Sequence, residues 1–188
     1  ADAITWAGFG LGMAGAGAIA LQRPLAGLAL LLASRLCDGL DGTVARLTRP
    51  TDRGAFLDIT LDFFFYAGVP LAFAWCDPAR NALAAATLLA AFIGTGVTFL
   101  AYAIMAEKRG DKSTDYPSKS FYYLGGLTEG FETVLCFVAM CLWPAAFAPL
   151  ASAVLYVETP GLMNTDFAAI DYQRRDMNFW PRVENPWA

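Results

Sequence analysis

The sequence predicts an all-helical integral membrane protein, built as a bundle of six transmembrane helices. Of its 188 residues, 57% are hydrophobic and only 16% are charged, against about 25% charged residues in a typical soluble domain. The mean hydropathy of +0.45 agrees with this class. The apolar residues also fall in runs near the length of about 20 that crosses a bilayer. A backbone inside lipid must satisfy its own hydrogen bonds, so these runs are expected to be helices.

Polar breaks divide the chain into the six predicted spans. The spans are residues 4–21, 25–46, 55–75, 82–106, 121–142 and a shorter one at 145–157. They form one expected membrane domain, residues 1–157. The remaining residues, 158–188, are polar and aromatic without an apolar run, and no function is assigned to this tail.

The distribution of positive charge predicts the orientation of the spans. The connections after the second and fourth spans are rich in arginine and lysine, whereas the opposite connections hold only Arg23 and Arg80. Because basic loops stay on the cytoplasmic side, the two basic connections are expected to face the cytoplasm. Both termini then lie in the cytoplasm, and a bacterial inner membrane is the expected location.

Composition also excludes several function classes. The net charge is −4, and the chain has no basic stripe with interleaved aromatic residues, so nucleic acid is not an expected partner. The absence of histidine removes histidine metal sites and histidine general bases. The four cysteines have no CxxC spacing and are interpreted as small packing residues.

Four aspartates in the second and third spans are the most informative feature. Asp38 and Asp41 are three residues apart, and Asp58 and Asp62 are four apart, so each pair shares one helix face. At about 1.5 Å per residue, Asp41 and Asp58 lie about 6–8 Å from the connected ends of their helices, and Asp38 and Asp62 about 12 Å. The four carboxylates are therefore predicted to converge in one small volume within the membrane.

Four carboxylates at this depth predict a divalent metal site. Each one costs at least about 2.5 kcal/mol on insertion scales, and like charges this close repel or protonate one another. Oxygen ligands favour hard ions, so two Mg²⁺ are expected, with Mn²⁺ or Ca²⁺ as alternatives. Two such ions can bridge and polarise a pyrophosphate.

Small and basic residues near the aspartates fit a phosphate ligand. Gly39, Gly42 and Gly54 leave room for a bulky ligand near the carboxylates. Arg46 carries a fork of donors suited to phosphate. An alternative for this arginine, and for the two that follow it in the connection, is anchoring at the cytoplasmic surface.

These residues carry a family resemblance. The pattern D-x2-D-G-x2-A-R-x7-G-x3-D-x3-D, which fixes eight positions between Asp38 and Asp62, resembles the signature of the CDP-alcohol phosphotransferases. The layout of six helices is similar as well, and residues 2–5 resemble the segment that precedes the family's first helix. The resemblance thus extends over most of residues 1–157.

The resemblance implies an activity and a role for each motif residue. A phospho-alcohol group, with CDP-diacylglycerol as the implied donor, would pass to an acceptor hydroxyl that attacks the β-phosphorus, and CMP would leave. Asp62 would be both metal ligand and general base, and the family's members are often homodimers. The resemblance assigns metal binding to Asp38, Asp41 and Asp58, and the CDP site to Gly42, Ala45, Arg46 and Gly54.

Charged residues in and beside the fifth span suggest where the acceptor binds. Glu129 and Glu132 are three residues apart on the fifth span. Arg35 lies one turn deeper in the membrane than Asp38, at about the depth expected for the two glutamates. They form either a polar wall for the acceptor alcohol or an internal ion pair. Lys112 and Lys119, in the basic connection, could attract an anionic acceptor such as an inositol phosphate or glycerol phosphate, or contact anionic lipid instead.

Two alternative functions remain at this point. The same chemistry could use a soluble CDP-alcohol as donor and a lipid as acceptor. A divalent-cation transporter is the alternative of another class, because carboxylates at depth also mark ion pathways. Transporters often show repeated halves and broken helices, which this sequence does not display, so the transferase is preferred.

Overall fold

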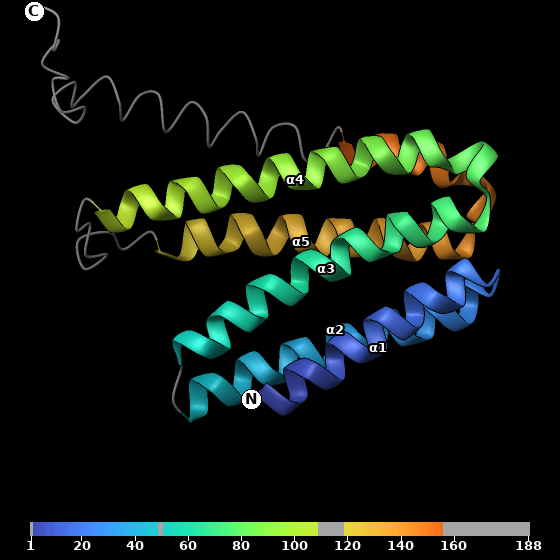
Figure 1. The fold of residues 1–188 in the computed structure, drawn as a ribbon. Coiled ribbons are helices and arrows are strands. Elements are labelled where there is room, and N and C mark those ends of the chain that lie inside the picture. Colours follow the sequence, from blue (N-terminus) through green and yellow to red (C-terminus); the bar gives the residue numbers. More distant parts are fainter. Residues whose placement is uncertain (1, 49–50, 109–118, 156–188) are drawn as a thin grey trace, which may run out of the picture.

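The protein is a bundle of long helices (Figure 1). The computed structural model describes residues 2–48, 51–108 and 119–155, with the side chains of all of these except 45–46, 99, 102–103, 105–108 and 119–130. No strand occurs in these ranges, which confirms the predicted helical class. The helices are α1 (Asp2–Ala20), α2 (Pro24–Leu47), α3 (Asp52–Cys76), α4 (Pro78–Lys108) and α5 (Lys119–Leu142), followed by η1 (Pro144–Ala146), which opens the short helix Pro144–Leu155.

The helices begin where local chemistry favours a start. Pro24 occupies the first turn of α2, where its missing N–H costs nothing. The hydroxyl of Thr51 accepts a hydrogen bond from the backbone N–H of Gly54 and caps α3. The carboxylate of Asp77 likewise accepts from the backbone N–H of Arg80 and caps α4. These caps explain why the structure starts both helices three or four residues before the apolar runs predicted from the sequence.

Among the described residues, three helices are long and apolar enough to cross a membrane. They are α1, α3 and the part of α4 from Pro78 to Thr98. The helices Phe131–Leu142 and Pro144–Leu155 are apolar but shorter. The chain is therefore an integral membrane protein, while the count of six spans and the side of the membrane stay predictions.

Close helix packing builds the frame that carries the polar residues. Helix α1 packs along α2 and α3, α3 also packs along α4, and α2 contacts α5. A Cβ added at Gly15 would lie 3.0 Å from the carbonyl oxygen of Gly27, so glycine permits a close approach of α1 to α2 at this point. The aromatic core includes the stacked rings of Phe73 and Phe147, 4.7 Å apart.

The bundle has two distinct ends (Figure 1). One end, hereafter the motif end, gathers the start of α1, the end of α2, the start of α3, the end of α4 and the start of α5. The other, hereafter the turn end, holds the turns from α1 to α2 and from α3 to α4. The two halves of the aspartate motif therefore meet at the motif end, because α2 approaches it and α3 leaves it.

Candidate functional site

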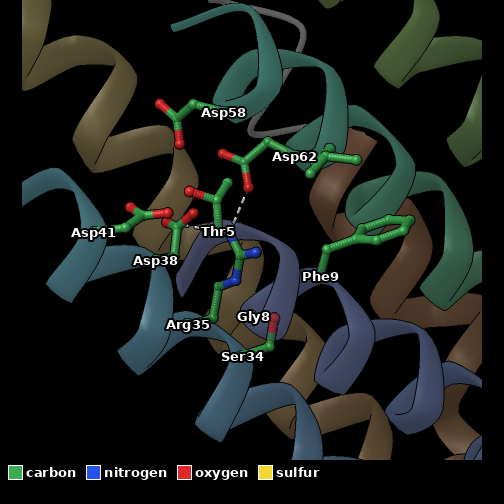
Figure 2. A pocket seen from close by; sticks show the side chains of 10 residues that line it. Thr5, Gly8, Phe9, Ser34, Arg35, Asp38, Asp41, Asp58 and Asp62 are labelled. Carbon is green, nitrogen blue, oxygen red and sulfur yellow. Dashed lines mark hydrogen bonds and ion pairs between the residues drawn. The ribbon is translucent and has the colours of Figure 1, made fainter. Parts of the chain in front are cut away.

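A pocket at the motif end is lined by residues of three helices (Figure 2). All four aspartates of the motif line it, two from α2 and two from α3. The other lining residues are Thr5, Gly8 and Phe9 of α1, Ser34 and Arg35 of α2, and Leu61 of α3.

Helix α1 closes one side of this pocket because it lies very near α2. A Cβ added at Gly8 would be 3.0 Å from the Cβ of Cys37 and 3.4 Å from the carbonyl oxygen of Ser34. Only a glycine lets the two backbones come this close without displacing either helix. Gly8 thus sets the distance at which Thr5, one turn earlier on α1, faces the carboxylates.

Three of the aspartates form a compact oxygen cluster. One carboxylate oxygen from each of Asp38, Asp41 and Asp58 lies within 4.8 Å of the other two. Ligands on opposite sides of a Mg²⁺ ion are about 4.2 Å apart, and those of a Ca²⁺ ion about 5 Å, from their usual bond lengths. The separation is therefore on the scale of a single hard cation.

The burial of Asp41 tests whether this cluster fits a metal. Asp41 is only 4% exposed, and its Oδ2 is a buried atom with no hydrogen-bond partner among the described residues. A buried carboxylate oxygen without a donor is costly unless a cation compensates it. Asp58 is exposed, so an ion reaching the cluster has a route from outside. The donor set and its burial both fit a divalent cation.

Asp62 lies in the same pocket but has a different partner. Its Oδ1 accepts a hydrogen bond from Nη1 of Arg35 at 2.7 Å, and the same nitrogen is 3.5 Å from Oδ2 of Asp38. Among the described residues, the cluster of mutually close carboxylate oxygens does not include Asp62. Figure 2 shows the Arg35 side chain rising between Asp38 and Asp62. The pocket therefore contains a three-carboxylate group and a separate ion pair.

The remaining motif residues have varied surroundings. A Cβ at Gly39 would meet open space, and a Cβ at Gly54 would lie 3.1 Å from Oγ1 of Thr51. Gly42 is half-buried. The side chains of Ala45 and Arg46 lie outside the described set.

The residues expected at the acceptor are mostly outside the described structure. Lys112 and the tail 158–188 are not among the described residues, and the side chains of Lys119 and Glu129 are not described. Glu132 is exposed. The sequence placed Arg35 at a depth where it could pair with a glutamate of the fifth span. Its described ion pairs are instead with an aspartate of α2 and an aspartate of α3.

Two further residues at the pocket escaped the sequence reasoning. Ser34 is fully buried, and its hydroxyl has no hydrogen-bond partner among the described residues. Thr5 lines the pocket from α1. Residues 2–5 were expected to precede the first helix, but they form its first turn, because α1 begins at Asp2. The available signal was position: Ser34 lies one turn before Asp38 on α2.

Comparison with known proteins agrees with this geometry. The sequence profile of the family described as CDP-alcohol phosphatidyltransferase matches residues 1–162. The chain belongs to this family. The protein named "Inner membrane protein YnjF" of Escherichia coli (strain K12) is 54% identical over 147 residues, which cover 78% of this chain and 71% of that protein. No solved structure matches the chain.

Membership in the CDP-alcohol phosphatidyltransferase family identifies the class of reaction. The matched region contains the whole pocket and all described helices, so the family's chemistry, phosphatidyl transfer from a CDP-alcohol, belongs to the bundle itself. The name of the Escherichia coli relative states a location in the inner membrane and no activity. The apolar helices and the likeness to an inner membrane protein together support an integral membrane protein.

Proposed function

We propose that this protein transfers a phosphatidyl group from CDP-diacylglycerol to the hydroxyl of an acceptor alcohol and releases CMP, with a divalent metal ion at the pocket. The observation that carries the proposal is the group of three carboxylate oxygens within 4.8 Å of one another, next to a fourth aspartate in the same pocket. This donor set suits Mg²⁺, and Mn²⁺ is the expected substitute.

The roles of the metal ligands follow from burial and charge. Asp38, Asp41 and Asp58 would hold the ion, and the buried Oδ2 of Asp41 gains the cationic partner that it otherwise lacks among the described residues. A bound divalent ion polarises phosphoryl oxygens and stabilises the charge that develops on the leaving phosphate.

Asp62 would act as the general base and, as the family resemblance implies, also as a metal ligand. The acceptor O–H loses its proton to the carboxylate of Asp62 while its oxygen forms a bond to the β-phosphorus of the donor. The bond from that phosphorus to the bridging oxygen breaks, and its electron pair leaves with CMP. Gly42, Ala45, Arg46 and Gly54 would line the nucleotide, since they belong to the same motif on the connected ends of α2 and α3.

The basic connections indicate how the bundle is oriented in the membrane and from which side the acceptor reaches the pocket. We place the motif end at the cytoplasmic face because α2 and α4 both end there, and the sequence segments that follow these two helices are rich in arginine and lysine. Lys112 and Lys119 would then attract an anionic acceptor, and Glu129 and Glu132 would contact its hydroxyls. A homodimer is the proposed assembly, as the family resemblance implies.

A donor and acceptor screen tests the proposal. The purified protein in lipid nanodiscs would be given CDP-diacylglycerol, Mg²⁺ and a series of alcohols, including inositol phosphate and glycerol phosphate, and CMP release measured. We expect CMP only when an acceptor and a divalent ion are both present. Turnover with a soluble CDP-alcohol and diacylglycerol alone would reverse the donor assignment. No CMP with any pair, together with metal flux into liposomes, would replace the transferase by the transporter.

Substitution of Asp62 by asparagine tests its role as base. The amide keeps the shape of the side chain but cannot accept the proton, so turnover should fall about 100- to 10,000-fold. Asp52→Asn is the matched control, because Asp52 lies exposed in the first turn of the same helix and outside the pocket lining. Full activity in Asp62→Asn would remove the base assignment.

A further inference from the structure

A second cavity lies at the turn end of the bundle, opposite the carboxylate pocket. It has a volume of about 530 Å³, which is typical of a ligand-binding pocket. It shares no lining residue with the carboxylate pocket. The polar residues that line it come from the turns after α1 and α3 and from the first turn of α4, and they are Gln22, Asp77, Arg80 and Asn81.

An apolar groove adjoins this cavity and shares Arg80 and Ala148 with it. The groove has a volume of about 430 Å³ and lies between α4 and the helix Pro144–Leu155. On α4 its lining extends from Arg80 to Thr87, which is about 10 Å along the helix axis. Its apolar lining residues are Leu83, Ala84, Ala148, Pro149, Ala151 and Leu155. The cavity and the groove together form one site with a polar end and an apolar end.

Two opposite charges line the polar end without neutralising each other. The backbone N–H of Arg80 donates to Oδ1 of Asp77. The side chains of the two residues are not joined, since the three ion pairs among the described residues involve neither of them. Arg80 is exposed and Asp77 is half-buried. The cavity therefore offers a ligand a separate cation and a separate anion.

Gln22 carries a side chain where the backbone favours glycine. Its φ is 61°, in the left-handed region, and no other described residue except glycine has a positive φ. The backbone N–H of Gln22 donates to the carbonyl of Ile19, and that of Arg23 donates to the carbonyl of Ala18. This pair of hydrogen bonds ends a helix with a residue in the left-handed conformation, which is usually glycine. Because Gln22 lines the cavity, its amide is placed there at a cost that a ligand contact would explain.

We propose that this site binds a phospholipid with an ethanolamine headgroup from the leaflet at the turn end. The phosphate lies against the guanidinium of Arg80, whose fork of donors suits phosphate oxygens. The ammonium group lies against the carboxylate of Asp77, the amide of Gln22 donates to the phosphate, and an acyl chain follows the groove. The surrounding bilayer supplies such a ligand. A zwitterion matches both charges, whereas an anionic headgroup leaves Asp77 beside a phosphate without a cation.

Native mass spectrometry of the purified full-length protein in detergent tests the proposal. Dioleoyl phosphatidylethanolamine and dioleoyl phosphatidylglycerol are titrated separately, because they share the phosphate and the acyl chains and differ in the ammonium group. We expect the ethanolamine lipid to bind about tenfold more tightly. Free phosphoethanolamine and dioleoylglycerol should each bind more weakly than the whole lipid, since each fills only one end of the site. No metal and no CDP-alcohol is present, so the result does not depend on the proposed transferase activity.

Two charge variants separate the halves of the headgroup. Arg80→Gln should weaken the binding of both lipids about tenfold, because both carry the phosphate. Asp77→Asn keeps the helix cap and removes the charge, so it should weaken only the ethanolamine lipid and bring the two affinities within about twofold of each other. The matched control is Arg23→Gln, at an exposed position of the same end outside both linings, and it should alter neither affinity.

Two further variants act on the groove and on the strained turn. Ala148→Phe should fill the groove and weaken both lipids at least about fivefold, since less of the acyl chain is buried. Ala82→Phe is its control, because Ala82 is exposed on α4 and lines neither space. Gln22→Gly should raise the thermal stability of the lipid-free protein and still weaken the ethanolamine lipid a few-fold. A side chain with a structural role only would not show this opposite pair of changes.

Three outcomes would overturn the proposal. The first is equal affinity of the wild type for the two lipids. The second is an equal loss of binding in Arg80→Gln and Arg23→Gln, which would mean that lipid is held by surface charge alone. The third is a change from dimer to monomer in Ala148→Phe with lipid binding unchanged, because a second copy of the chain would then cover the groove.

Discussion

The two ends of the bundle use polar residues in opposite ways. At the turn end, the carboxylate of Asp77 accepts from the backbone N–H of Arg80, and the amide of the buried Asn81 donates to the carbonyl of Phe73. These side chains satisfy backbone groups at a helix junction. At the motif end, the carboxylates face one another instead, and across the described residues every buried side-chain polar atom without a hydrogen-bond partner belongs to Ser34, Arg35 or Asp41.

This difference separates structural from functional polar groups in the same chain. Buried polar atoms in folded proteins are nearly always paired, and each exception needs an explanation. The turn end shows that this fold can pair its polar residues with backbone groups. The unpaired atoms of the motif end therefore point to groups that await a ligand, which is the role that we propose for Asp41.

The strongest test of this comparison replaces Asp41 by asparagine. Turnover should fall on the order of 1,000-fold, because a ligand of the charge-stabilising ion is lost. Thermal stability in the presence of a chelator should rise, since a buried charge without a hydrogen-bonding partner is removed. Both effects are measured on one preparation, as CMP release and as the midpoint of thermal unfolding in detergent.

Asp77→Asn is the counterpart at the turn end. Asparagine is as good a helix cap as aspartate, so this variant should match wild type in both measurements. A lower thermal stability of Asp41→Asn in the presence of chelator would contradict the interpretation that the buried Asp41 carboxylate destabilises the metal-free protein and is kept for metal binding.

A second test acts on the packing beneath the site. Gly12→Ala places a methyl group where Phe65 and Ser34 already lie, so overpacking should lower the free energy of unfolding by about 1–3 kcal/mol. Turnover should fall about tenfold, because the displaced ring no longer supports the guanidinium of Arg35, whose Cζ lies 3.7 Å from the ring centroid in a cation–π contact. The control is Gly10→Ala on the same helix, where an added Cβ meets nothing within 4 Å. Equal effects of the two substitutions would show that helix propensity, and not the Phe65 contact, is responsible.

Sequence reasoning reached the helices and the convergence of the four aspartates on one pocket for one physical reason. Lipid forces the backbone into helices, and the helical rise converts sequence separation into depth. The helix boundaries differ from the structure by a few residues at most, chiefly where Thr51 and Asp77 extend α3 and α4 with caps. Depth along an axis was therefore predictable from the residue numbers alone.

Rotation about the helix axes and lateral neighbours were not predictable in this way. Arg35 lies at a depth that allowed a glutamate of α5 or an aspartate of α3 as partner, and depth does not choose between them. The choice depends on Phe65, which positions the guanidinium toward Asp62. The contribution of α1 was missed for the same reason, because the contact of Gly12 with Phe65 is a matter of side-by-side packing.

A third test concerns stability at the turn end alone. Asn81→Ala removes a buried amide that donates to the carbonyl oxygen of Phe73 at 3.0 Å. That oxygen also accepts from the backbone N–H of Asp77, so it keeps one partner, and the loss should be about 1 kcal/mol. Turnover at a temperature well below unfolding should stay unchanged. Thr87→Ala, which removes an exposed hydroxyl bonded within α4, should change neither quantity; a drop in turnover for Asn81→Ala would show that the two ends are coupled.

The last test compares two side-chain helix caps of the same kind, one at each end of α3. Thr51 accepts from the backbone N–H of Gly54 at 3.1 Å, and Asp77 accepts from that of Arg80 at 3.2 Å. Substitution of either residue by alanine should cost about 0.5–2 kcal/mol of stability. Because both alanine variants should lose the same stability, any difference in their activity reports a difference between the motif end and the turn end.

Activity should distinguish the two caps where stability does not. Thr51 caps the helix turns that present Asp58, seven residues further along α3, so fraying there loosens one ligand of the carboxylate group. Thr51→Ala should therefore lower turnover a few-fold and restore it in part at higher Mn²⁺ concentration, whereas Asp77→Ala should leave both turnover and its metal dependence as in wild type. An equal loss of activity in the two variants would mean that global stability, and not the local geometry of the motif end, limits the reaction.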